Sequence, residues 1–233
     1  MRMTVRPETA GLLPADTAGF VSADLSEAED LIRRGRRRRW RKGGVLCSQE
    51  ESSQWIAVLL SGVVKASVYT EDGGEVLLSL HGPGALVGEL EALDGKPRPA
   101  TLTALEPVEA AVISHPEFMM FMRDHSQAMW LVVEALCRRL READAFRIQY
   151  ASYNTTGRVA KLLVTLAERY GQAGEHGILI PVALTQTELA SWVGASREAV
   201  SAALRSLRSR GWIRTGRRRL VVCDLVALRS LAS

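Results

Sequence analysis

Residues 184–213 limit the possible folds of the chain more than any other stretch. The stretch opens with Thr185 and has Glu188 three residues later, a spacing at which each side chain can cap the other residue's backbone amide at a helix start. Gly194 predicts a sharp turn, because glycine enters the left-handed backbone region without a steric penalty, and Ser196 predicts the cap of a second helix. The pattern predicts a helix–turn–helix.

The second helix, expected over residues 196–208, has one apolar face. Val200, Leu204 and Leu207 recur at helical spacing and are expected to point inward, which leaves the N-terminal half of the other face exposed to base edges. Arginine can donate two hydrogen bonds to guanine and a carboxylate can accept one from cytosine, so Arg197 and Glu198 suit a G·C pair. The predicted DNA-contacting residues are Thr185, Gln186, Ser196, Arg197, Glu198, Ser201, Arg205, Arg217 and Arg218.

Charge gathers at the same end of the chain. The segment RTGRRRLVVCDL, directly after this stretch, predicts a β-hairpin wing that lies against the phosphate backbone. From residue 184 to the C-terminus there are nine Lys/Arg against three Asp/Glu, a net charge of +6, whereas the whole chain carries +4. A basic end on a nearly neutral body is typical of nucleic-acid binding, although a structural three-helix unit with a solvated basic face is the alternative.

Composition excludes several other classes of protein. A length of 233 residues and 47% hydrophobic content indicate a globular chain with room for two modest domains. No apolar run approaches the roughly twenty residues that span a bilayer and no signal peptide is visible, so we expect a cytoplasmic protein without a membrane segment. The cysteines, Cys47, Cys137 and Cys223, are far apart, and no metal site, disulfide framework or catalytic spacing is expected.

The N-terminal part predicts a tail followed by β-structure. Residues 1–24 show no period and are expected to form a flexible tail, while residues 26–34 predict a short helix. The basic run at residues 33–42 leads into a strand and is expected to be a solvated edge, with a nucleic-acid tail as the alternative. From 44 to 113, short apolar runs alternate with turn residues, which predicts an antiparallel β-roll within a domain at 25–116.

A long helix is expected next, over residues 117–153, with a break near Pro116. Apolar residues in it step by three and four, the spacing of a parallel coiled-coil dimer, although the pattern falters at Arg147. The alternative is a helix packed on its own β-roll with only part of its length at the interface. Residues 154–157 are the expected hinge before a DNA-binding domain at 154–233. The predicted dimerisation residues are Val133, Leu136, Leu140, Ala143 and Tyr150.

Three motifs, in this order, carry a resemblance to a known family: LSGVVKASVYTEDGGEVLLSLHGPGALVGEL, TTGRVAKLLVTLAERYG and LTQTELASWVGASREAVSAALRSLRSRGWI. From about Leu25 onward the chain resembles the CRP/FNR superfamily of bacterial transcription regulators. The resemblance implies an α+β fold with a cyclic-nucleotide-binding-like β-roll, a long dimerisation helix and a C-terminal winged helix–turn–helix. It also implies a homodimer that binds a palindromic operator on double-stranded DNA, RNA polymerase as a further partner, and a cyclic nucleotide or another small effector.

The resemblance also implies roles for residues of the β-roll. Glu89 matches the residue that holds the ribose, and Arg98 matches the one that holds the cyclic phosphate. Pro99 stands where the cyclic-nucleotide members have a serine, so an amide and a hydroxyl donor are missing, and the purine-contacting residues align to Ala143 and Asp144. Cyclic AMP is therefore expected to be a weak effector or none. The full predicted ligand set is Gly88, Glu89, Leu90, Arg98, Pro99, Ala100, Ala143 and Asp144.

From their chemistry alone, Glu89 and Arg98 could equally form a structural pair that bridges two strands.

On the DNA side, Arg197 and Glu198 align with residues that read the half-site GTGA in family members, while a further base-reading arginine aligns to Ala202. Sequence specificity is therefore expected to be partly relaxed. A nucleotide-responsive sensor that acts through protein partners is the alternative function. The basic winged helix–turn–helix favours the DNA-binding regulator.

Overall fold

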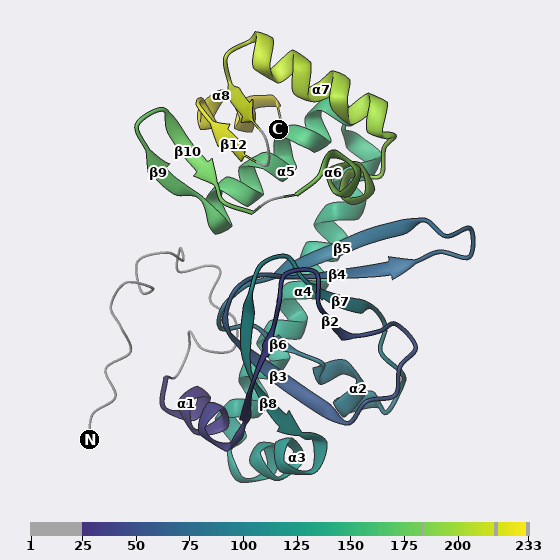
Figure 1. The fold of residues 1–233 in the computed structure, drawn as a ribbon, viewed down its shortest axis with the longest axis vertical. Coiled ribbons are helices and arrows are strands. Elements are labelled where there is room, and N and C mark those ends of the chain that lie inside the picture. The colour runs from purple at the N-terminus through teal and green to yellow at the C-terminus, as the bar shows by residue number, and fades with distance from the viewer. Residues whose placement is uncertain (1–24, 183, 217–218, 232–233) are drawn as a thin grey trace. The chain divides into compact units, whose positions relative to one another are not determined.

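The computed structural model describes residues 25–182, 184–216 and 219–231. The described chain forms two compact units that divide within a helix, one ending at Arg147 and the other beginning at Ile148 (Figure 1). The predicted tail at residues 1–24 lies outside the described part. Among the described residues, no helix combines the length and the apolar character that crossing a membrane requires.

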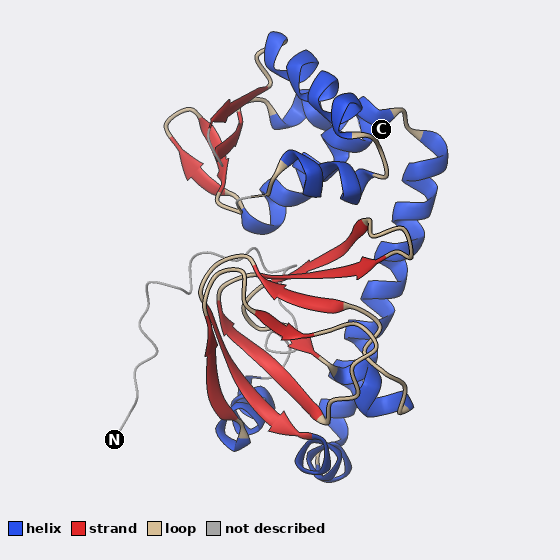
Figure 2. Ribbon diagram, turned by 45° about the vertical axis from the view of Figure 1, so that its right-hand side comes forward, coloured by secondary structure: helices blue, strands red, loops and turns tan. Residues whose placement is uncertain are grey.

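The N-terminal unit is built on two four-stranded antiparallel sheets, which confirms the predicted β-roll (Figure 2). One sheet has the order β1-β8-β3-β6 and the other β2-β7-β4-β5. The strands are β1 (Arg36–Trp40), β2 (Val45–Cys47), β3 (Trp55–Ser61), β4 (Val64–Tyr69), β5 (Glu75–His81), β6 (Leu86–Val87), β7 (Thr101–Ala104) and β8 (Val108–Ser114).

The core of this unit follows the alternation of β3. Ala57 and Leu59 face the second sheet, while Ile56 and Val58 face a cluster formed with helix residues, because successive side chains of a strand point to opposite sides. All four are buried. The helices of the unit are α1 (Leu25–Arg34), α2 (Glu89–Asp94), α3 (His115–Asp124) and α4 (Ser126–Ser152).

The prediction of one helix over residues 117–153 is wrong, because α3 and α4 are separated at His125. The backbone of His125 leaves helical geometry (φ −127°, ψ 88°), its Nδ1 lies 3.0 Å from the Phe121 carbonyl oxygen, and the two rings stack with centroids 4.1 Å apart. Pro116 lies in the first turn of α3, where a missing amide costs nothing, and Ser114 caps the helix in a reciprocal pair with Glu117.

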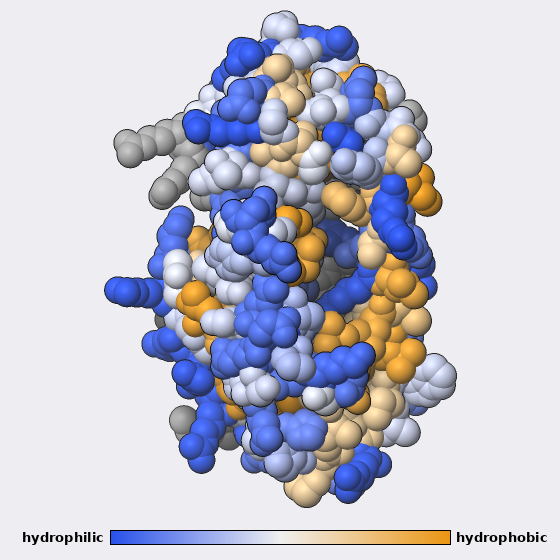
Figure 3. All heavy atoms as spheres, turned by 90° about the vertical axis from the view of Figure 1, so that its right-hand side faces the viewer, coloured by the Kyte–Doolittle hydropathy of each residue, from blue (hydrophilic) through white to orange (hydrophobic). Residues whose placement is uncertain are grey.

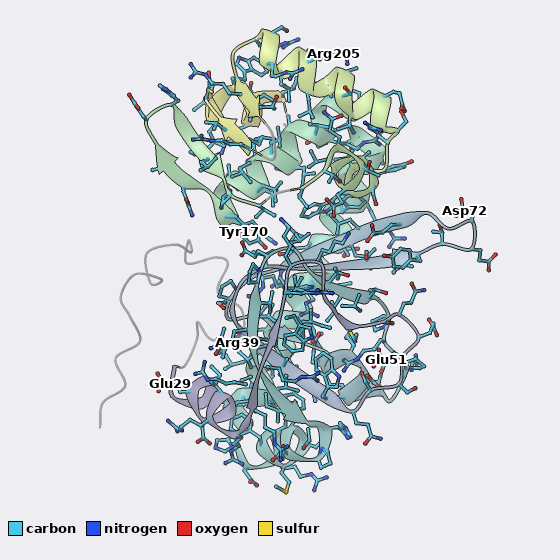
Figure 4. The ribbon with its side chains drawn as sticks, viewed as in Figure 1. Glu29, Arg39, Glu51, Asp72, Tyr170 and Arg205 are labelled. Carbon is cyan, nitrogen blue, oxygen red and sulfur yellow. The ribbon has the colours of Figure 1, made fainter. Side chains whose placement is uncertain are left out.

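The basic run contains the edge strand β1, as expected. Arg37 and Arg39 project to the same side of the strand, and both pair with Glu109 of β8, at 2.7 and 2.9 Å. Figure 4 labels Arg39. The Arg37 guanidinium, together with Arg39, lowers the pKa of the Glu109 carboxyl from its usual value. A charged outer strand of this kind discourages edge-to-edge pairing with another chain.

The C-terminal unit combines helices with a small sheet. Asn154 accepts a hydrogen bond from the Gly157 amide (3.0 Å) and so caps the first complete helix of the unit. The sheet order is β11-β12-β10-β9. The elements are α5 (Thr155–Tyr170), β9 (Gln172–Gly174), β10 (Gly177–Ile180), α6 (Gln186–Val193), α7 (Arg197–Ser209), β11 (Ile213–Gly216), β12 (Arg219–Val222) and α8 (Leu225–Leu231).

Candidate DNA-reading surface and effector pocket

The turn between α6 and α7 has the predicted caps. Thr185 Oγ1 accepts from the Glu188 amide (3.1 Å) while Glu188 Oε2 accepts from the Thr185 amide (2.8 Å). Gly194 ends α6 in the left-handed region at φ 61°, and Ser196 Oγ accepts from the Ala199 amide (3.1 Å) at the start of α7. These bonds satisfy amides that a helix start leaves unpaired, and the predicted helix–turn–helix is confirmed.

The two faces of α7 separate as the sequence predicts. Val200, Leu204 and Leu207 are buried, whereas Arg197 and Glu198 are exposed on the first turn. Further along the outer face, Arg205 donates a hydrogen bond to the half-buried Ser201 (3.0 Å), and Figure 4 labels Arg205 on the outside of the helix. The exposed face therefore offers both donors and acceptors to a base edge.

The remaining DNA-contact residues lie around α7. Thr185 and Gln186 are exposed at the start of α6, and Ser196 is exposed at the start of α7. The wing is the β11–β12 hairpin, and Arg208 of α7 donates to Thr215 of β11 (2.9 Å). Arg217 and Arg218 lie outside the described residues. Two further arginines of the wing, Arg214 and Arg219, are described and exposed.

The N-terminal unit contains a cavity of about 240 Å³ at the predicted effector site. Gly88, Glu89, Leu90, Arg98, Pro99 and Ala100 all contribute to its lining, so the structure brings these six predicted residues together. Ala143 and Asp144 are exposed on α4 and do not belong to that lining. The residues that sequence reasoning missed are Cys47, Ala66, Leu78, Ser79, His81, Val87, Glu91, Leu102 and Arg139.

Arg98 is held inside the wall of this cavity and is only 2% exposed. Its Nε donates to Ser53 Oγ (2.8 Å), and its Nη2 donates to the carbonyl oxygens of Ser53 (3.3 Å) and Trp55 (2.5 Å). The guanidinium carbon lies 4.5 Å from the centre of the Trp55 ring, and Nε lies 2.8 Å from Glu91 Oε2. Gly88 has φ 86°, a conformation that favours glycine, and an added Cβ would also lie 3.0 Å from the Trp55 carbonyl oxygen and against Arg98 Nη1.

Glu89 is also buried and pairs with an arginine from α4. Its Oε1 accepts from Arg139 Nη1, and Arg139 Nη2 donates to the Leu86 carbonyl oxygen (2.8 Å). Neither Glu91 nor Arg139 was expected in the pocket. Glu91 lies two residues after Glu89 in the same motif, whereas nothing in the sequence distinguishes Arg139 from the other arginines of α4.

The predicted dimerisation residues differ in their surroundings within this subunit. Val133 and Leu140 are exposed on α4, at 37% and 64%, but Leu136 is partly buried against the core of its own unit. The Tyr150 ring instead lies 4.6 Å from the guanidinium carbon of Arg158, within the C-terminal unit. Hydrophobic residues gather in a band along α4 (Figure 3).

No group of His, Cys, Asp and Glu side chains in the described part of the chain is arranged to hold a metal ion. Burial raises the pKa of the Cys47 thiol, an effect that nearby Arg98 opposes. The described lining of the cavity combines two ion pairs, the polar side chains of Ser79 and His81, and apolar residues.

Comparison with known proteins gives matches in both units. The cyclic nucleotide-binding domain family matches residues 37–125, and the Crp-like helix-turn-helix domain family matches residues 157–231. A protein of Mycobacterium tuberculosis named CRP-like cAMP-activated global transcriptional regulator is 32% identical over 183 residues, which cover 78% of this chain and 82% of that one. A protein of Salmonella typhimurium named cAMP-activated global transcriptional regulator CRP is 28% identical over 178 residues, covering 76% and 84%.

Among solved structures, a CRP-family transcriptional regulator from Thermus thermophilus has a TM-score of 0.73 at 26% identity and covers 84% of this chain and 96% of that one.

Proposed function

The chain belongs to the family of CRP-like transcription regulators, and from this premise we propose that it regulates transcription as a homodimer bound to DNA. The α7 helix of each subunit reads one half of a palindromic operator, and the cavity of the β-roll holds a small effector. RNA polymerase is the expected protein partner. The protein acts in the cytoplasm, where its DNA target lies, and it has no enzymatic activity.

The observation that carries the proposal is the exposed pair Arg197 and Glu198 on the first turn of α7. The caps at Ser196 and at Thr185 fix this turn, and the buried side of α7 leaves only one face available to DNA. The surrounding residues carry a net positive charge, which supplies the part of the affinity that does not depend on sequence.

A sensor module that acts only through protein partners would need the cavity but not the basic helix–turn–helix. The formation of both caps, the turn and the wing supports the DNA-binding function over this alternative.

The first experiment compares the affinity of Arg197→Ala and wild type for a symmetric GTGA-containing duplex and for random DNA. We expect the change to cost about 1–3 kcal/mol on the symmetric duplex and to flatten the preference at one base pair, because a bidentate contact is lost.

Arg219→Ala serves as the matched control, since it removes an exposed arginine of the wing. It should weaken binding to both duplexes equally and reduce the slope of log affinity against log salt by about 1. The same result is expected for Arg217→Ala and Arg218→Ala. Equal losses on both duplexes for Arg197→Ala would show that α7 does not read bases as proposed.

A further inference from the structure

The charged groups of the β-roll cavity already neutralise one another. Glu89 pairs with Arg139, and Glu91 pairs with Arg98. These are the Asp, Glu, Lys and Arg side chains among the described residues that line the cavity, so its wall carries no net charge from them.

The donors of Arg98 are nearly all in use. Its Nε donates to Ser53 Oγ and its Nη2 donates to two backbone carbonyl oxygens, those of Ser53 and Trp55. Only Nη1 is buried without a partner. A phosphate is normally gripped by two parallel N–H donors of the guanidinium, and Arg98 has one nitrogen to offer.

Both carboxylate oxygens of Glu91 have a partner that holds the side chain beside Arg98. Its Oε1 accepts from the Ser53 amide (2.7 Å), while its Oε2 lies 2.8 Å from Arg98 Nε. The Glu91 side chain is 12% exposed. An anion that entered the cavity would meet a guanidinium whose charge is already balanced, and it would also be repelled by the carboxylate.

Two polar atoms of the described lining, one donor and one acceptor, are buried without a hydrogen bond or an ion-pair contact, whereas Glu91 Oε2 lies 2.8 Å from Arg98 Nε, and Ser79 Oγ and His81 Nε2 lie 2.9 Å from each other. Arg98 Nη1 is the donor, and Glu89 Oε2, which is also buried without a partner, is the acceptor. Buried polar groups of this kind are normally satisfied by a partner. Much of the remaining lining is apolar, namely Ala66, Leu78, Val87, Leu90, Pro99, Ala100 and Leu102.

We propose that Glu91 excludes anions from this cavity, and that the effector is an uncharged, largely apolar molecule with one oxygen acceptor for Arg98 and one hydroxyl or N–H donor for Glu89. This inference rests on the proposed effector role of the cavity. The cavity volume of about 240 Å³ lies just below the usual range of ligand pockets, about 300–1,000 Å³, and therefore suits a small molecule.

The test is calorimetric titration of the full chain with cyclic AMP and with adenosine, which lacks the phosphate but keeps hydroxyls for Glu89. We expect wild type to bind cyclic AMP no more tightly than adenosine. Pro99 also lacks a donor for the phosphate, so Glu91→Gln is examined in a Pro99→Ser background. The double variant should bind cyclic AMP at least about tenfold more tightly than Pro99→Ser alone.

Glu91→Gln keeps the size of the side chain and an oxygen for the Ser53 amide but removes the charge. Glu71→Gln, an exposed position outside the cavity, is the matched control in the same background and should leave the affinity unchanged. Thermal unfolding of each variant checks that the fold is kept.

The inference is overturned if wild type binds cyclic AMP at least about tenfold more tightly than adenosine, since the phosphate would then be recognised. It is also overturned if Glu91→Gln fails to tighten cyclic AMP binding in the Pro99→Ser background, because Glu91 would then position Arg98 rather than block it. Binding of the same preparations to DNA without ligand reports separately on the proposed function.

Discussion

Cys47 shows how burial changes the chemistry of a single residue in the β-roll. Its side chain is 2% exposed, and desolvation raises the pKa of the thiol. At neutral pH the reactive thiolate is therefore a smaller fraction than in the unfolded chain, and reagents also reach it poorly. Cys47 should consequently be inert although it lines a cavity.

This expectation can be measured in a Cys137→Ser/Cys223→Ser variant, in which Cys47 is the remaining thiol. At neutral pH a thiol reagent should modify the folded protein at least about tenfold more slowly than the urea-unfolded protein, with the native rate rising as the pH approaches the raised pKa. Equal rates in the folded and unfolded protein would contradict the burial of Cys47.

Some pocket residues could be predicted from the sequence and others could not. The difference depends on how far apart in the chain the interacting residues lie. Glu89 and Arg98 belong to one short motif, so the sequence indicates both. Their actual partners cannot be deduced in the same way, because Arg139 reaches Glu89 from fifty residues away and Ser53 reaches Arg98 from forty-five. These contacts exist only once the sheets and α4 are in place.

Among the elements, the α6–turn–α7 segment depends on Gly194. Its backbone lies at φ 61°, and an added Cβ would lie 2.8 Å from the Tyr150 ring. Because the Tyr150 side chain is 56% exposed and can move aside, Gly194→Ala should lower the free energy of unfolding by at least the roughly 1–2 kcal/mol that the left-handed conformation costs alone, with any excess due to displacement of the ring. Urea unfolding followed by tryptophan fluorescence measures the difference.

Gly211 provides the matched control, because its φ is 75° and no atom lies within 4 Å of an added Cβ. Gly211→Ala should lose only the conformational cost. Equal losses for the two variants would show that contact with Tyr150 contributes nothing.

Local patterns predicted elements well where the deciding contacts are also local. The caps at Thr185 and Ser196 involve residues three positions away, and both form as expected. The break at His125 was not expected; the His125 side chain there bonds to the Phe121 carbonyl oxygen and stacks on its ring, contacts that the sequence pattern does not reveal. The partial burial of Leu136 against its own unit likewise could not be read from its spacing along the helix.

At the scale of the whole molecule, the helix proposed to read DNA and the cavity proposed to bind an effector lie in different units. The C-terminal unit holds the α7 helix and residues 184–233, which carry nine Lys/Arg against three Asp/Glu, while the N-terminal unit holds a cavity without net charge among its Asp, Glu, Lys and Arg side chains. In the proposed homodimer, the exposed apolar residues of α4 would contact the second subunit, which supplies the second α7.

The most direct test of the account is selection of binding sites for the full chain from randomised duplex DNA. We expect the enriched sites to be two-fold symmetric, with half-sites about 10–10.5 base pairs apart from centre to centre, because two α7 helices must enter successive major grooves. Enriched sites without symmetry, or no enrichment over random DNA, would contradict the account.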